Sequence, residues 1–347
     1  MIVRLLLLLS VLLLPGGLLV QESTGDRNSR NTLANVLTRV RARPVDPQAV
    51  EDAVQIGLTL VAAGRYQESI DLFSAVIEAR PDEYRAFYGT ALASLNLGQT
   101  TTAEANARAA LVALSRKENI APTAKYGKAD ALVLLGVILA VKGDNGAALS
   151  SVTEAARLAP ESFDAQFALG RALFGAGNPA SAAVAFQRAV TLQPANSSSR
   201  FFLATALEAT GDYEGARKTY SELIALQPNK AEGHLGLGVL LIKLGGENTE
   251  QGIQELQKAI LFNDSYEARV TLGRAQVKAG RFSEAVENLT RAAELAPNNP
   301  EPHYQLAIAY SRLGKKAEAE RASARVKEIN SQRRGTDVNM SGNKSPH

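Results

Sequence analysis

The chain has 347 residues, no cysteine and a formal net charge of +3, with acidic and basic side chains interleaved along its length. The absence of cysteine excludes disulfides, thiolate catalysis and cysteine-ligated zinc or iron–sulfur centres. The charge is mild and shows no clustered basic face, so we expect no nucleic-acid partner.

The first twenty residues are apolar after a single positive charge. Arg4 precedes the stretch Leu5–Leu14, in which Ser10 is the only polar residue, and a Pro-Gly-Gly break follows at 15–17. This order is typical of a secretory signal peptide or an N-terminal membrane anchor, although no A-x-A cleavage site is present. We expect a protein that is exported (periplasmic or otherwise extracytoplasmic) or anchored in the inner membrane by residues 1–20. The alternatives are a buried N-terminal helix or a misassigned start.

Residues 21–49 follow as a polar linker and one leading helix. Within them, Asn31–Arg43 shows a helical pattern that ends where Pro44 restricts the conformation of Arg43.

Eight glycines then recur through the chain at intervals of 34 or 35 residues, apart from one longer interval of 45. A period of this length predicts stacked copies of one helix-turn-helix unit, in which each glycine ends the first helix. The glycines are Gly64, Gly98, Gly143, Gly177, Gly211, Gly245, Gly280 and Gly314.

Each copy also carries small residues at two fixed places. One lies midway along the first helix, at Gly57, Ala91, Gly136, Gly170, Ala204, Gly238, Gly273 and Ala307. The other opens the second helix, at Ser69, Ala103, Ala148, Ala182, Ala216, Gly252, Ala285 and Ala319. A proline closes five of the copies, at Pro81, Pro160, Pro194, Pro228 and Pro297. This pattern resembles the tetratricopeptide repeat family, although the family's early tryptophan is absent from every copy.

The resemblance implies an all-α fold, a right-handed α-solenoid of about eight tandem helix-turn-helix repeats. We place the repeats at 50–83, 84–117, 129–162, 163–196, 197–230, 231–265, 266–299 and 300–333. An insertion at 118–128 separates the second and third repeats and either extends two helices or forms a loop. Residues 334–347 are polar and without periodicity, which predicts a disordered tail.

Family geometry implies that positions two, five, nine, twelve and thirteen of each repeat line a concave, largely apolar groove. Such a groove suits an amphipathic helix or an extended hydrophobic peptide. The candidate partner-binding residues are Tyr88, Phe167, Phe201 and Tyr304 at position five, and Arg171, Thr205 and Arg274 at position nine.

Motifs of enzymes are lacking in the sequence. There is no G-K-[ST] phosphate loop, G-x-S-x-G or H-E-x-x-H motif. His234 and His303 occupy the same place in two repeats, too far apart to converge, and we expect both to be ordinary helix-surface residues. The sequence therefore predicts no catalytic residue, no metal and no cofactor.

We expect a non-enzymatic scaffold or adaptor that binds a protein or peptide partner and contacts a membrane only through its N-terminal segment. The alternative is a regulatory or assembly subunit of an envelope enzyme or of a secretion or polysaccharide-export machine. Self-association through the groove is also open.

Overall fold

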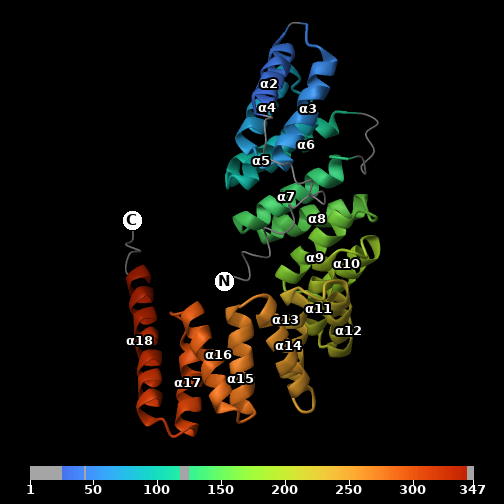
Figure 1. Ribbon diagram of the computed structural model, residues 1–347. Helices are drawn as coiled ribbons and strands as arrows, with labels where there is room; N and C mark the ends of the chain where they lie inside the picture. Colours follow the sequence, from blue (N-terminus) through green and yellow to red (C-terminus); the bar gives the residue numbers. More distant parts are fainter. Residues whose placement is uncertain (1–25, 43, 118–124, 342–347) are drawn as a thin grey trace. The chain divides into compact units, whose positions relative to one another are not determined.

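The computed structural model describes residues 26–42, 44–117 and 125–341, and these residues form helices joined by short turns, without a strand among them (Figure 1). The leading helix is α2 (Asp26–Arg41). The predicted signal peptide or anchor at 1–20 lies outside the described residues.

The chain forms two compact units that divide between Pro194 and Ala195. The N-terminal unit contains, after α2, the helices α3 (Pro47–Ala62), α4 (Tyr66–Ala79), α5 (Tyr84–Asn96), α6 (Thr100–Ser115), α7 (Lys128–Lys142), α8 (Asn145–Leu158), α9 (Phe163–Gly175) and α10 (Pro179–Leu192). The C-terminal unit contains α11 (Ser197–Thr210), α12 (Tyr213–Leu226), α13 (Ala231–Leu244), α14 (Asn248–Phe262), α15 (Tyr266–Lys278), α16 (Phe282–Leu295), α17 (Pro300–Arg312) and α18 (Lys316–Ser341).

Within each unit the helices stack as antiparallel pairs. Each helix packs against the next, and every second helix also contacts its counterpart in the neighbouring pair, as α13 contacts α15 and α15 contacts α17. The helices α3 to α18 make up about eight such pairs. The predicted all-α architecture of tandem helix-turn-helix repeats is therefore confirmed.

The recurring glycines end the first helices because the backbone there turns left-handed. All eight have positive φ, for example 79° at Gly177. At this turn the N–H of Gly177 donates to the carbonyl of Phe174, and the N–H of Asn178 donates to the carbonyl of Leu173. These two bonds satisfy carbonyls that the end of the helix leaves open, and glycine adopts the required φ without a Cβ penalty.

The small residues midway along the first helices let the paired helices approach closely. A Cβ added at Gly170 would lie 2.7 Å from the Phe186 ring, and one added at Gly273 would lie 2.5 Å from Leu289 Cγ. Phe186 and Leu289 are both fully buried. Gly238, which faces Leu256 in the same way, is thus a packing residue.

Two segments outside the regular repeats are the insertion at 118–128 and the C-terminal residues from 334. At the insertion, α6 ends before it at Ser115 and α7 begins at its last residue, Lys128; residues 118–124 lie outside the described part. At the C-terminus α18 extends to Ser341, so the disorder predicted from residue 334 is corrected to helix as far as 341. The helix continues because its sequence contains no proline and Ile329, which is 1% exposed, anchors it to the repeats.

Among the helices of the described residues, none combines the length and the apolar character that crossing a membrane requires.

Candidate partner-binding face

The first helix of each repeat carries positions two, five, nine, twelve and thirteen on one side, because these positions differ by three, four, three and one residues. In the C-terminal unit these positions lie on α11, α13, α15 and α17, each of which contacts the next in that order. We call the surface that they form the first-helix face of the unit.

Tyr304 on α17 is the most exposed aromatic residue of this face, with 57% of its surface accessible. Next to it on the same helix is Glu301, whose Oε1 lies 3.3 Å from a guanidinium nitrogen of Arg274 on α15. The side chains of this ion pair are 53% exposed at Arg274 and 42% exposed at Glu301. An accessible tyrosine beside an accessible arginine is the composition from which interface hot spots are built.

Phe201 and Thr205 on α11 are half-buried instead. The hydroxyl of Thr205 donates to the Phe201 carbonyl at 2.9 Å and lies 3.2 Å from the hydroxyl of Tyr220. The ring of Phe201 meets that of Tyr220 edge-on at 6.2 Å. Burial raises the pKa of Tyr220 to about 12, so its hydroxyl stays neutral. These contacts fix the α11 part of the face against its own second helix.

In the N-terminal unit the three candidate residues are largely enclosed. Tyr88 is half-buried, with its ring 5.2 Å from that of Tyr126, and burial raises its pKa. Arg171 is also half-buried, and burial lowers its pKa to about 10. Phe167 is only 4% exposed, with its ring stacked at 5.5 Å on Phe163 and tilted at 5.8 Å against Phe186.

The expectation that Phe167 presents an accessible ring is therefore corrected, since it is a core residue in this structure. The physical cause is Gly170, whose missing side chain leaves space that the Phe186 ring fills, and Phe167 packs on that ring. An aromatic residue on the facing second helix is the signal in the sequence that could have indicated this burial.

His234 is likewise not the surface residue that the sequence suggested, because it is 4% exposed. Its Nδ1 lies 2.6 Å from a carboxylate oxygen of Glu255 and its Nε2 lies 3.0 Å from the carbonyl of Pro228. Gln166, at the same repeat position in the N-terminal unit, donates its amide to the carbonyl of Pro160 at 3.0 Å. In both repeats the side chain at position four is thus hydrogen-bonded to the turn that precedes its own helix. His303 at the same position is half-buried.

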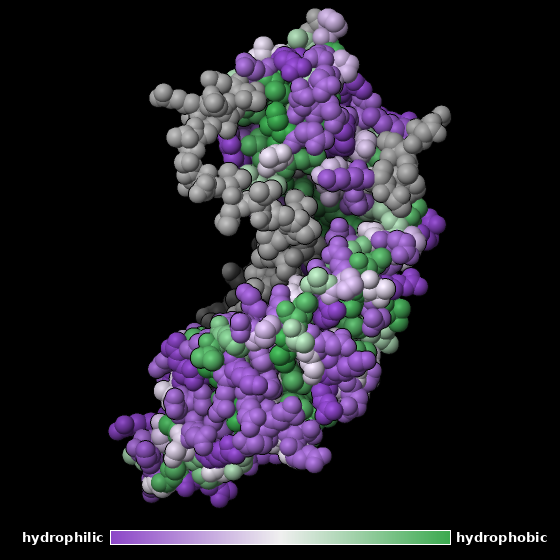
Figure 2. Space-filling view, turned by 45° about the vertical axis from the view of Figure 1, so that its right-hand side comes forward, coloured by the Kyte–Doolittle hydropathy of each residue, from purple (hydrophilic) through white to green (hydrophobic). Residues whose placement is uncertain are grey.

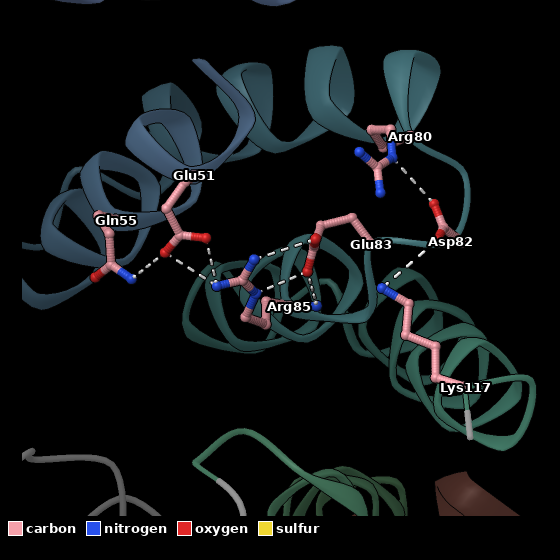
Figure 3. A network of polar contacts seen from close by, with 7 residues as sticks. All are labelled: Glu51, Gln55, Arg80, Asp82, Glu83, Arg85 and Lys117. Atoms are coloured by element: carbon pink, nitrogen blue, oxygen red, sulfur yellow. Dashed lines mark hydrogen bonds and ion pairs between the residues drawn. The ribbon is translucent and has the colours of Figure 1, made fainter. Parts of the chain in front are cut away.

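An ionic network links the first repeats of the N-terminal unit (Figure 3). The guanidinium of Arg85 donates to both carboxylate oxygens of Glu83 and to Glu51 on α3. The side chain of Glu83 is only 6% exposed, and these hydrogen bonds raise the pKa of Arg85. Because Arg85 and Glu51 are both position-two residues, their charges compensate each other on that face.

The first-helix face of the C-terminal unit has charged edges that sequence reasoning did not single out. Position two is glutamate on α13, α15 and α17, and position thirteen is lysine or arginine on the same helices, namely Glu232, Glu267, Glu301, Lys243, Lys278 and Arg312. Lys243 pairs with Glu208 at 2.9 Å, and Glu301 pairs with Arg274. Among the described residues, Glu232, Glu267, Lys278 and Arg312 form no ion pair. Comparing positions two and thirteen between repeats would have found them.

Two further properties of the described surface are the grouping of possible metal ligands and the distribution of apolar residues. In the part of the chain that the structure covers, no three His, Cys, Asp or Glu side chains are grouped so that they could hold a metal ion. Figure 2 shows hydrophobic residues on the drawn face as separate patches among hydrophilic ones.

Comparisons with known proteins identify the repeats. Models of the tetratricopeptide repeat match residues 54–118 and 133–197, residues 173–240, and, as a TPR repeat, residues 273–314. The chain belongs to the tetratricopeptide repeat family. Members of this family are protein-interaction scaffolds, and the repeat is a typical non-enzymatic fold.

Solved structures resemble this tetratricopeptide protein in fold at low sequence identity. The APC/C hetero-tetramer Cut9–Hcn1 is 16% identical with a TM-score of 0.51, over 89% of this chain and 58% of that chain. TTC0263, a thermophilic TPR protein in Thermus thermophilus, is 24% identical with a TM-score of 0.43, over 53% and 99% of the two chains. YrrB, a TPR protein with an unusual peptide-binding site, is 18% identical with a TM-score of 0.43, over 51% and 91%. No curated protein sequence matches the chain.

Proposed function

We propose that the protein is a non-enzymatic scaffold that binds a segment of a partner protein on the first-helix face of its C-terminal unit. The observation that carries the proposal is the accessible Tyr304, 57% exposed, beside the accessible Arg274–Glu301 pair. In the N-terminal unit the corresponding aromatic, Phe167, is buried in the core. The C-terminal unit therefore has contact surface that internal packing does not use.

The apolar part of this face adds to the binding surface. Leu235 and Val239 on α13 and Ile308 on α17 are only partly buried. A partner that covers them and Tyr304 removes apolar surface from water, which is favourable by roughly 25 cal/mol per Å². The tyrosine hydroxyl and the ion pair then supply directional contacts at the same place. This arrangement supports recognition of a peptide or helix and requires no reacting group.

The test is capture of partners by the full chain and by two variants. Tyr304→Ser/Ile308→Ser removes apolar contacts from the face, whereas Leu261→Ser removes an 80%-exposed leucine from the second helix α14. We expect the first variant to lose partners that the native chain and the Leu261→Ser variant both retain, with circular dichroism unchanged in all three. Partners retained by the Tyr304→Ser/Ile308→Ser variant would contradict the placement on this face.

We also propose that the protein is exported or anchored at a membrane by residues 1–20. Support comes from the composition of that segment, a single arginine ahead of a stretch that is apolar except for Ser10. Fractionation of cells that produce the full chain tests it. We expect the native chain outside the cytosolic fraction and a Leu8→Arg/Leu12→Arg variant within it. A native chain recovered in the cytosol would contradict the proposal.

A further inference from the structure

The first-helix face of the C-terminal unit has opposite charges along its two edges, and these charges indicate the chemistry of the partner. We infer that the partner segment is an amphipathic helix of about three to four turns, with basic side chains on one flank and acidic side chains on the other. This inference rests on the proposed function and specifies the partner of the same face.

The two edges keep charges that the described residues do not neutralise. Glu232 and Glu267 lie in the first turns of α13 and α15, and Lys278 and Arg312 lie in the last turns of α15 and α17. None of the four belongs to an ion pair of the described residues. Because first helices that are stacked side by side run in the same direction, the carboxylates gather along one edge and the cations along the other. Each edge therefore offers uncompensated charge of a single sign.

The helix dipole alone does not account for this pattern. Acidic residues in a first turn and basic residues in a last turn do stabilise a helix. The first helices of the N-terminal unit, however, fold without a charge at position thirteen, where they carry Ala62, Asn96, Val141 and Gly175. At position two of that unit, Arg85 and Glu51 pair with each other, while Asp130 and Asp164 are acidic as in the C-terminal unit. The combination of an acidic position two with a basic position thirteen is thus found on α13, α15 and α17 and on no first helix of the described N-terminal unit.

The floor between the edges has the width of one helix. Positions two and thirteen are eleven residues apart, which at a rise of 1.5 Å per residue is about 16 Å. A helix with its side chains is about 10–12 Å across, so one helix lies between the edges with its flanking charges in reach of both. The three helices α13, α15 and α17, side by side at interaxial distances of about 8–10 Å, offer about 16–20 Å of length. That length corresponds to three to four turns of the partner.

The middle of the floor suits the apolar stripe of such a helix. Leu235 on α13 and Tyr304 on α17, both at position five, lie between the charged edges of their own helices, and Tyr304 is 57% exposed. With this stripe facing the floor, the basic flank meets Glu232 and Glu267 and the acidic flank meets Lys278 and Arg312. Since only one direction of a given helix achieves this match, the edges also set the orientation of the partner.

The experiment uses three synthetic helical peptides of about fourteen residues that share one leucine stripe. One carries lysines on one flank and glutamates on the other, the second carries lysines on both flanks, and the third carries glutamates on both. Affinity for the full chain is measured by fluorescence anisotropy at low salt. We expect the split-charge peptide to bind about three- to tenfold more tightly than the others, and this preference to fall as salt screens the edges.

A charge-reversal variant makes the test specific to these residues. Glu232→Lys/Glu267→Lys makes both edges basic, so the preference should pass to the peptide with glutamates on both flanks. The matched control is Glu222→Lys/Glu287→Lys, which changes the charge equally at two exposed residues of the second helices α12 and α16. This control should leave the preference for the split-charge peptide unchanged.

Each outcome decides the question. A preference that passes to the glutamate peptide only in the Glu232→Lys/Glu267→Lys variant supports the inference. Peptides that bind the native chain equally, or a preference that moves in the control variant as well, overturn it while the proposed binding face stands. Absence of binding by all three peptides also overturns it, and the proposed function is then judged by the capture experiment with Tyr304→Ser/Ile308→Ser.

Discussion

At position five of their repeats, Phe167 in the N-terminal unit is 4% exposed and Tyr304 in the C-terminal unit is 57% exposed. The two residues occupy equivalent places on first helices, and both were expected to line a groove. The two residues also differ in what the second helix of their own repeat carries at the equivalent place. Phe167 packs against the ring of Phe186, whereas the corresponding place in the last repeat is Ser323, which is exposed.

The charged residues of the first helices also differ between the two units in how far they are paired within the chain. In the N-terminal unit Arg85 is bound by Glu83 and Glu51, so its charge serves internal contacts (Figure 3). In the C-terminal unit Glu232 and Lys278 have no such partner among the described residues. The comparison teaches that one repeat scaffold can bury the position-five aromatic of a first helix in one unit and leave it exposed in the other.

The largest expected difference in stability between the units comes from truncating the position-five aromatic residue of each. Phe167→Ala leaves a cavity in a packed core and should cost about 3–5 kcal/mol of unfolding free energy. Tyr304→Ala removes an exposed ring and should stay within about 0.5 kcal/mol. Urea unfolding followed by circular dichroism measures both, and hydrogen exchange assigns each loss to its unit. Equal losses in the two variants would remove the contrast between the units.

A smaller effect is expected at the glycines that face the second helices, and here the two units should behave alike. A Cβ at Gly170 would lie 2.7 Å from the Phe186 ring, and one at Gly273 would lie 2.5 Å from Leu289. Each glycine-to-alanine change should cost about 1–3 kcal/mol through overpacking. Gly175→Ala is the control, because nothing lies within 4 Å of that position. It should leave the urea midpoint unchanged or raise it; a fall equal to that of Gly170→Ala would contradict the steric explanation.

The position-four contacts should make the local stability of the C-terminal unit depend on pH and leave that of the N-terminal unit independent of it. Burial alone raises the pKa of Glu255, but the hydrogen bonds from His234 and Lys258 outweigh it and leave the pKa below its usual value. A carboxyl with a lowered pKa stabilises the folded state above its unfolded pKa of about 4.3, and this stabilisation is lost as the pH falls through the folded pKa. The Gln166 contact of the N-terminal unit has no titrating group.

We therefore expect the hydrogen-exchange protection of α13 and α14 to fall when the pH is lowered from about 5 towards about 3, and Glu255→Gln to reduce that dependence. Gln166→Ala should lower protection of α9 by the same amount at every pH in this range. An unchanged pH dependence in the Glu255→Gln variant would show that other carboxyls are responsible.

The sequence predicted the repeat architecture well because its determinants are local. Gly177 ends a helix through its own backbone conformation, and Gly170 allows close packing through its own missing side chain, so each can be recognised by type and spacing. The burial of Phe167, in contrast, involves Phe186, about twenty positions away on the facing helix. Periodicity along one helix contains no information about that partner, which is why Phe167 was placed incorrectly.

His234 illustrates the same limit for a polar residue. In its buried place its ring nitrogens meet two polar partners, the Pro228 carbonyl six residues before it and Glu255 on the next helix. Neither is apparent from a single histidine in an amphipathic pattern. The equivalent Gln166 does offer a signal, because a polar residue recurs at position four in both units where an apolar one would otherwise pack. The charged edges at positions two and thirteen were visible in the sequence in the same way, by comparing repeats.

The last expected effect on stability, that of Arg274, is also small, although its position gives it a large expected effect on binding. Its ion pair with Glu301 is about half exposed, with side-chain accessibilities of 53% and 42%, so Arg274→Ala should cost about 0–1 kcal/mol. Arg85→Ala in the N-terminal unit leaves the buried carboxylate of Glu83 without its guanidinium and should cost about 1–3 kcal/mol. Urea midpoints compare the two, and binding of the split-charge peptide provides the second measurement. If the first helices are core in one unit and contact surface in the other, Arg85→Ala lowers stability without changing peptide affinity, and Arg274→Ala changes affinity with the smaller loss of stability. The reverse result, a stable Arg85→Ala variant that loses the peptide, would place the contact surface in the N-terminal unit.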